Sequence, residues 1–135
     1  MRVFLDANIL FSASHARSRT RAFLDLVFQH AECLTNAYAL EEARHNLELK
    51  FPSALPRLDS LVKKCELIPA LVVEPGVELK AKDIPILGGA IAGNATHLLT
   101  GDERDFGVFF GKAIRGVKIV SPRMLADEMV HRGLL

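Results

Sequence analysis

The amino-terminal segment MRVFLDANIL (residues 1–10) shows most directly how this chain folds. Arg2 to Leu5 favours a β-strand because it is rich in apolar side chains that suit a sheet, and the run stops at Asp6. Residues 97–100, HLLT, form a second such run, and Asp102 follows it after one glycine. Both segments therefore predict a short strand with an aspartate at its carboxyl end.

Short apolar runs alternate with amphipathic segments along the rest of the chain. Further strands are expected over residues 31–35, 67–73 and 117–120, and helices over 18–30, 37–49, 53–64, 83–93 and 121–131, with a short segment near 106–110. Asp83 is the predicted N-cap of the fourth of these helices, with Pro85 in its first turn and Gly93 at its end. Strands that alternate with helices predict a parallel sheet with helices on both faces.

The length and composition are those of one globular domain. Of the 135 residues, 50% are hydrophobic and 24% charged, which excludes a disordered or fibrous protein and predicts a single domain over residues 1–135. Lysine and arginine number 17 against 16 acidic residues, so the formal net charge is only +1. With so small a net charge, the protein as a whole does not attract nucleic acid electrostatically. Any phosphate binding must therefore come from local basic patches or metal ions.

The sequence favours neither export nor membrane insertion. Asp6 and Asn8 interrupt the apolar amino-terminal run, and a basic helical segment follows where a signal peptide would have its cleavage site. Residues 84–99 are the longest other apolar stretch, but a proline and several glycines break it, so no membrane span is expected. Cys33 and Cys65 lack metal-binding spacing and are expected as reduced thiols, which predicts a cytoplasmic location.

Several carboxylates are expected at one edge of the sheet. In open parallel sheets, ligands bind beyond the carboxyl ends of the strands, where the strand order reverses. If the first and fourth strands are neighbours, Asp6 and Asp102 share a crevice there. Asp83, Asp105 and the glutamates at 41–42 reach the same rim. Each acid alone is explained as a turn residue or a helix cap, but their convergence is not.

Such a group of carboxylates needs a counter-charge. Two carboxylates about 4 Å apart repel by ~4 kcal/mol at an effective dielectric constant of about 20. No basic residue lies between Asp6 and Phe11, or between Asp83 and Gly101. A hard divalent cation is therefore the expected counter-charge, and oxygen-only ligands suit Mg²⁺ or Mn²⁺ better than zinc.

Four segments of the chain resemble the PIN-domain family in their order and intervals. They are residues 3–10 (VFLDANIL), 40–43 (LEEA), 82–87 (KDIPIL) and 98–106 (LLTGDERDF), so the resemblance spans nearly the whole chain. It implies a metal-dependent endoribonuclease that hydrolyses RNA phosphodiester bonds. It also implies a three-layer, doubly wound α/β sandwich with a mainly parallel five-stranded sheet of order 3-2-1-4-5.

The resemblance also implies which residues act. The expected catalytic residues are Asp6, Glu42, Asp83 and Asp102, and the expected ligands of Mg²⁺ or Mn²⁺ are Asp6, Asp83, Asp102 and Asp105. Glu42 matches the family's helix glutamate better than Glu41 does, although both residues stay candidates for this position. Asn8 is expected to orient the first aspartate, and Thr100 to bond a phosphate oxygen or a metal-bound water.

The expected RNA contacts are basic side chains. Arg17 and Arg19 follow the first strand, and Arg104 lies in the Asp102 loop, where the three would form a phosphate-contacting rim. The sequence shows no aromatic platform for base stacking. Compact PIN proteins are often toxins of toxin–antitoxin pairs, and homodimers are common among them. The resemblance therefore implies RNA, an antitoxin protein and a second copy of the chain as partners.

Other functions fit the residues less well. A haloacid-dehalogenase-like phosphatase requires a second aspartate where Asn8 stands, and a receiver domain requires a phosphorylatable aspartate where residues 73–75 read VEP. A non-catalytic PIN-like module that binds RNA or a protein is the alternative outside the enzymes. The presence of all four acid positions argues against it.

Overall fold

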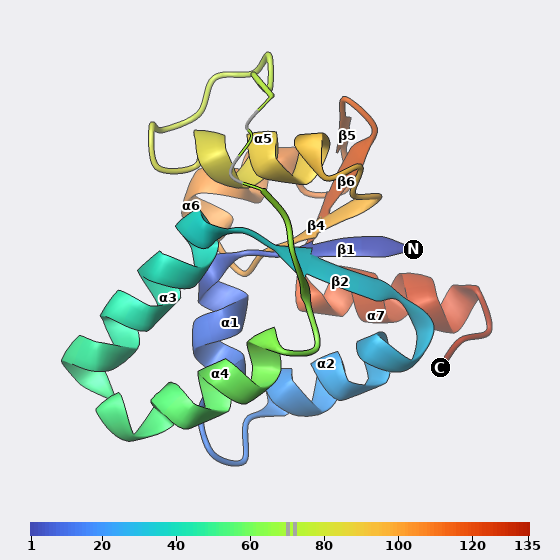
Figure 1. Ribbon diagram of the computed structural model, residues 1–135. Helices are drawn as coiled ribbons and strands as arrows, with labels where there is room; N and C mark the ends of the chain where they lie inside the picture. Colours follow the sequence, from blue (N-terminus) through green and yellow to red (C-terminus); the bar gives the residue numbers. More distant parts are fainter. Residues whose placement is uncertain (70, 72) are drawn as a thin grey trace.

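The computed structural model describes residues 1–69, 71 and 73–135, which form one sheet with helices on both faces (Figure 1). The strands are β1 (Arg2–Leu5), β2 (Glu32–Thr35), β3 (Glu66–Leu67), β4 (His97–Leu99), β5 (Ala113–Ile114) and β6 (Val117–Val120). The helices are α1 (Ala7–Ala13), α2 (Arg19–His30), α3 (Ala37–Lys50), α4 (Leu55–Val62), α5 (Ile84–Ala92), α6 (Glu103–Phe106) and α7 (Pro122–His131), with 3-10 turns η1 (Pro52–Ala54) and η2 (Gly107–Phe109).

The sheet has the order β3-β2-β1-β4-β6-β5, and β1 pairs in parallel with both β2 and β4. The expected order 3-2-1-4-5 is confirmed, with β6 as the fifth strand of that prediction. The sheet has one strand more than predicted. This additional strand is β5, which pairs antiparallel with β6 through a tight turn at Arg115 and Gly116. Both turn residues have positive φ, as a type I′ hairpin turn requires. A two-residue strand leaves too weak a pattern to be predicted.

Two elements differ from the prediction. β3 covers Glu66–Leu67 instead of 67–73; residues 68, 69, 71 and 73 lie outside it, and residues 70 and 72 lie outside the described residues. The reason is that β2, the strand with which β3 pairs, ends at Thr35, opposite Leu67. α1 was not predicted, because the apolar run that it continues fits a strand as well as a helix.

The helices form two layers around the sheet. Figure 1 shows α5 on one side of the sheet and α1, α2 and α7 on the other. Phe4, Leu5, Leu98 and Leu99 are fully buried between these layers, so β1 and β4 are apolar on both faces, as central parallel strands must be. Because the strand order reverses between β1 and β4, their carboxyl ends open into the crevice that such folds use for ligands.

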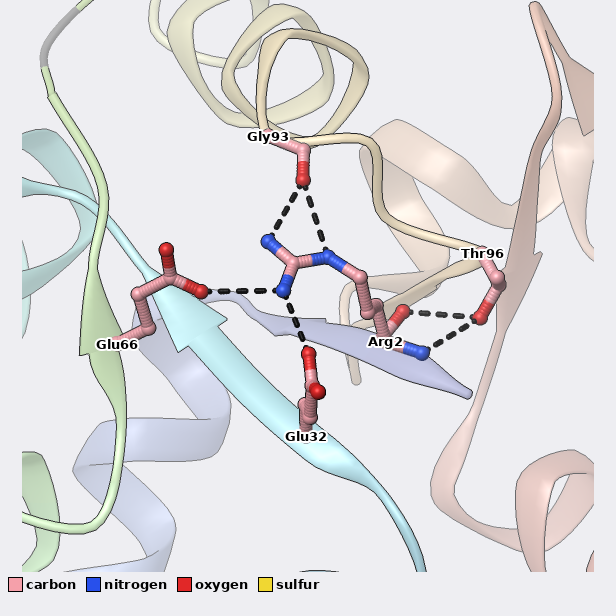
Figure 2. Close-up of polar contacts among 5 residues, drawn as sticks. All are labelled: Arg2, Glu32, Glu66, Gly93 and Thr96. Atoms are coloured by element: carbon pink, nitrogen blue, oxygen red, sulfur yellow. Dashed lines mark hydrogen bonds and ion pairs between the residues drawn. The ribbon is translucent and has the colours of Figure 1, made fainter.

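Arg2 ties the strands together at the opposite, amino-terminal end of the sheet (Figure 2). Its Nη1 lies 2.7 Å from Glu32 on β2 and 3.1 Å from Glu66 on β3. Its Nε and Nη2 donate to the Gly93 carbonyl at 3.2 and 2.8 Å, at the end of α5. The Arg2 guanidinium therefore links three strands to the end of α5. These contacts lie at the end of the sheet opposite to Asp6 and Asp102.

No helix within the described residues combines the length and the apolar character needed to cross a lipid bilayer.

Candidate metal centre

A cleft of about 320 Å³ opens at the carboxyl ends of the strands. Asp6 directly follows β1, and the segments before α5 and α6 bring Asp83 and Asp102 to the same place. The lining residues come from α1, α3 and the segments before α5 and α6: Asp6, Ala7, Asn8, Phe11, Glu42, Asn46, Lys50, Lys82, Asp83 and Asp102. All four expected catalytic acids therefore line a single cleft.

Asp6 is buried at the start of α1 and is held by three hydrogen bonds. Its Oδ1 accepts from the Ala7 amide at 2.6 Å, and its Oδ2 accepts from Thr100 Oγ1 at 2.8 Å and from Asn8 Nδ2 at 3.1 Å. Burial, reinforced by the charges of Glu42 and Asp102, raises the pKa of Asp6 to about 6 despite these donors. A carboxylate has about four acceptor sites, so one stays open for a ligand or a water.

Thr100 and Asn8 position the acids. The Thr100 side chain is fully buried and donates to Asp6, while its Oγ1 accepts from the Asp102 amide at 3.1 Å. Asn8 uses both ends of its amide, because its Oδ1 also accepts from the Gly101 amide at 2.8 Å. Thr100 was expected to contact the substrate, but its hydroxyl is buried and is not accessible from the cleft. Both residues instead fix Asp6 relative to the loop that carries Asp102.

Asp83, Asp102 and Asp105 approach one another most closely. One carboxylate oxygen from each lies within 4.8 Å of the other two. Asp83 occupies the N-cap position of α5, as predicted, but its side chain caps nothing, and its buried Oδ2 has no hydrogen-bond partner among the described residues. Burial and the adjacent Asp105 carboxyl raise the pKa of Asp83 to about 7. Asp102 Oδ1, in contrast, accepts from the Asp105 amide at 3.0 Å and caps α6.

Two lysines supply a counter-charge that the sequence analysis missed. Lys80 Nζ lies 2.8 Å from Asp105 Oδ1, and Lys82 Nζ lies 3.1 Å from Asp105 Oδ2. Lys80, and then Lys82, hold the pKa of Asp105 well below its usual range. The expectation that only a cation balances the acids is therefore wrong for Asp105, whose side chain is 3% exposed. The lysines lie more than twenty residues earlier in the sequence, so spacing along the chain did not associate them with it.

A hard divalent cation fits the carboxylate oxygens of this cluster, Asp105 included. The three aspartates offer only oxygen ligands, which Mg²⁺ and Mn²⁺ prefer, and Asp83 Oδ2 is a buried acceptor that lacks a donor. Opposite ligands of a Mg²⁺ ion lie about 4.2 Å apart, so oxygens within 4.8 Å need only small side-chain movements to share one. Asp6 lines the same cleft but is outside this closest group.

The helix glutamate that reaches the cleft is Glu42. Glu42 lines the cleft, and its charge contributes to the raised pKa of Asp6, whereas Glu41 is exposed on α3 and does not line the cleft. The two residues are neighbours, so they project about 100° apart around a helix of 3.6 residues per turn. The packing of α3 decides which of them faces the acids.

The arginines expected at the rim lie elsewhere. Arg17 lines a separate hollow past the end of α1, and Arg19 and Arg104 are exposed without lining the cleft. The basic side chains that do line the cleft are Lys50 and Lys82. Lys50 ends α3, and its pattern in the sequence is that of an ordinary basic residue in a last helical turn.

A larger hollow, of about 760 Å³, does not share this chemistry. It lies beside α2 and the edge of the sheet. Its acids are paired with basic side chains: Asp25 lies 3.6 Å from Lys64, and Arg2 binds Glu32 and Glu66. With their charges balanced, these acids give no reason to expect a metal ion there.

Two solved structures share the fold. A chain from the crystal structure of VapBC2 from Rickettsia felis, bound to a DNA fragment from their promoter, matches with a TM-score of 0.66 and 20% identity over 90% of this chain and 98% of that chain. A chain from VapBC-1 of nontypeable Haemophilus influenzae matches with a TM-score of 0.62 and 14% identity, over 91% and 99%. No protein-family model and no curated protein matches the sequence. The two structures confirm the PIN-like fold that the sequence motifs imply.

Proposed function

We propose that this chain is a metal-dependent endoribonuclease that hydrolyses RNA phosphodiester bonds in the acidic cleft, and that it acts as the toxin of a toxin–antitoxin pair. The observation that carries the nuclease proposal is the convergence of Asp83, Asp102 and Asp105 beside the buried Asp6. The antitoxin part is supported by the two similar structures, which are VapBC assemblies. A homodimer and a cytoplasmic location stay predictions.

In this proposal Asp83, Asp102 and Asp105 would hold Mg²⁺ or Mn²⁺, and Asp6 lines the same cleft. The ion, when bound, supplies a Lewis acid that lowers the pKa of water and neutralises charge on the phosphate. Asp6, whose pKa is about 6, is largely ionised near neutral pH and has an acceptor site open to a proton of the attacking water. Lys82 and Lys50 line the cleft where they can bind phosphate oxygens.

The decisive experiment is cleavage of a labelled, structured RNA with Mn²⁺ or with EDTA. We expect internal cleavage that requires the metal and that falls by about 100-fold or more in Asp6→Asn and in Asp102→Asn, because each removes a charge from a preorganised site. Cleavage that persists in EDTA, or that survives in both variants, contradicts the proposal. RNA binding without cleavage in Mn²⁺ favours the alternative, a non-catalytic RNA- or protein-binding module.

The neighbouring glutamates provide a matched pair for the same assay. We expect Glu42→Gln to reduce cleavage by about 10-fold or more, because it removes a charge that faces Asp6. Glu41→Gln removes the same charge one residue away, outside the cleft, and should cleave like the wild type. Equal effects of the two substitutions would show that the position of the charge in the cleft is unimportant.

A further inference from the structure

Three aromatic rings meet at the side of the cleft, although they are scattered in the sequence. Phe11 on α1 lines the cleft, His15 follows α1, and Phe51 follows α3. The His15 ring lies 4.9 Å from Phe11 and 4.7 Å from Phe51, and Phe11 lies 6.2 Å from Phe51, all edge to face. No stacking platform is evident in the sequence because Phe51 lies about forty residues after Phe11 and joins it only when α3 packs against α1.

Phe51 leaves much of its ring open. Its side chain is 48% exposed, and it joins two rings that are only half-buried. Lys50, the residue before it, lines the cleft and holds its Nζ 6.0 Å from the centre of the Phe11 ring. Open aromatic surface beside a cation is the combination that single-stranded nucleic acids use, with bases on the rings and phosphates on the basic groups.

A basic hollow of about 430 Å³ continues from the rings on the side away from the acids. His15 lines it together with Arg17, Arg21 and Arg57. Arg57 Nε donates to the Ser14 carbonyl at 2.7 Å, which fixes this guanidinium at the end of α1. Asp25 also lines the hollow and pairs with Arg21, so three arginines face one carboxylate and the surface is basic overall. His15 belongs both to this hollow and to the ring cluster, so the two surfaces are continuous.

We propose that the surface from the acidic cleft over Phe11, Phe51 and His15 to this hollow binds single-stranded RNA, with a base stacked on Phe51. Lys50 and then the arginines bind the phosphates on either side of that base. This extends the proposed function, because it states that the strand leaving the cleft is unpaired and names where it runs. It also assigns a place in RNA binding to Arg17, which does not line the acidic cleft.

Tryptophan substitution tests the stacking directly, since the chain has no tryptophan of its own. In the Phe51→Trp variant, the indole fluorescence should be quenched when a short oligoadenylate binds in EDTA, where no cleavage occurs. Leu49→Trp is the matched control, because Leu49 is 70% exposed, lies two residues earlier and is outside the ring cluster. Its fluorescence should not change. Emission of Phe51→Trp that is unaffected at saturating oligoadenylate would overturn the inference and favour a protein partner for these rings.

Affinity provides the second readout. By fluorescence anisotropy in EDTA, Phe51→Ala and Phe51→Leu should both bind oligoadenylate about 10-fold more weakly than the wild type, since the leucine keeps apolar volume but has no π-face. Phe51→Trp should restore binding, and Leu49→Ala should leave it unchanged. An abasic oligomer of the same length should bind wild type and Phe51→Ala equally. Equal oligoadenylate affinities for Phe51→Ala and wild type, or no binding by the wild type, would overturn the inference.

The outcomes separate this inference from the proposed function. A protein that cleaves RNA with Mn²⁺ but binds oligoadenylate independently of Phe51 is a nuclease without the stacking site. A protein that binds through Phe51 but never cleaves has the stacking site without the nuclease activity.

Discussion

Asp83 is the residue that ordinary folding requirements explain least. It occupies a helix N-cap without capping, and it keeps a buried oxygen unpaired, at a free-energy cost that a surface aspartate would avoid. Lys80 and Lys82 pair with Asp105 instead. A buried carboxylate that lacks a donor is expected where a ligand supplies the missing contact.

Because the buried, unpaired carboxylate of Asp83 costs free energy, we expect the metal-free protein to be more stable when this carboxylate is replaced by a neutral side chain. The pKa of Asp83 is raised from an ordinary 3.8 to about 7, so its contribution to stability is complete below about pH 4 and is lost as the pH rises through 7. We expect Asp83→Asn to raise the free energy of unfolding in EDTA by about 1–3 kcal/mol above neutral pH, with the gain vanishing in acid. Thermal unfolding across this pH range measures it.

Asp127→Asn is the control for this substitution, because Asp127 is an exposed carboxylate on α7 and its removal should change stability little. Adding Mn²⁺ should raise the melting temperature of the wild type, since a ligand that binds only the folded state stabilises it, and should raise that of Asp83→Asn much less. A variant that melts below the wild type at alkaline pH in EDTA would contradict this account of Asp83.

Among the elements, α5 depends on a glycine for its close approach to α3. A Cβ on Gly89 would collide with the Asn36 side-chain amide, which is buried. That amide caps α3 through the Ala39 N–H at 3.1 Å and donates to the Pro85 carbonyl at 3.1 Å. The glycine therefore lets one side chain start α3 and hold the first turn of α5, which carries Asp83 into the cleft.

We expect Gly89→Ala to destabilise the protein by about 1–3 kcal/mol through overpacking, although replacing a glycine in a helix normally stabilises it. Gly107→Ala is the comparison, because the nearest atom to its added methyl group is 4.0 Å away, and it should change stability by about 0.5 kcal/mol or less. Urea unfolding of the two variants gives the difference. A Gly89→Ala protein as stable as the wild type would mean that Asn36 moves aside without loss.

The elements also mark where sequence patterns suffice. β1, β4 and β6 are buried apolar runs with clear ends, and α5 and α7 carry start signals in Pro85 and Ser121, so their positions follow from local chemistry. α1 and β5 do not, because a run such as residues 7–13 fits a helix or a strand equally. β3 ends early because its partner does, which is a property of two segments together.

At the scale of the whole molecule, the residues of the candidate site and the Arg2 contacts that stabilise the fold lie at opposite ends of the sheet. The acids gather at the carboxyl ends of the strands, and the Arg2 contacts lie at the amino ends. We expect Arg2→Met to lower the free energy of unfolding by about 1–2 kcal/mol, since it loses two hydrogen bonds to Gly93 and two partly exposed ion pairs. Under the proposed function, the folded variant should cleave RNA as the wild type does, because Arg2 lies at the opposite end of the sheet from the cleft.

Urea unfolding measures this effect, and Arg44→Met is the control. Within the described part of the chain Arg44 makes one ion pair, with the exposed Asp59, which should contribute about 1 kcal/mol or less. Equal destabilisation by the two substitutions would show that the linkage of three strands by Arg2 adds nothing beyond a surface ion pair.

Local chemistry along the chain specified the alternation of strands and helices and the aspartates that follow two of the strands, whereas the strand order followed from the resemblance to PIN domains. A short apolar run followed by an aspartate indicates the end of a strand whatever the rest of the chain contains. Right-handed crossovers then limit the ways in which such strands can be connected. Packing between distant segments selected Glu42 over Glu41, paired Lys80 and Lys82 with Asp105, enclosed Thr100 and brought Phe51 to Phe11. These contacts depend on how helices turn and where loops return in space, and neither periodicity nor residue preference carries that information.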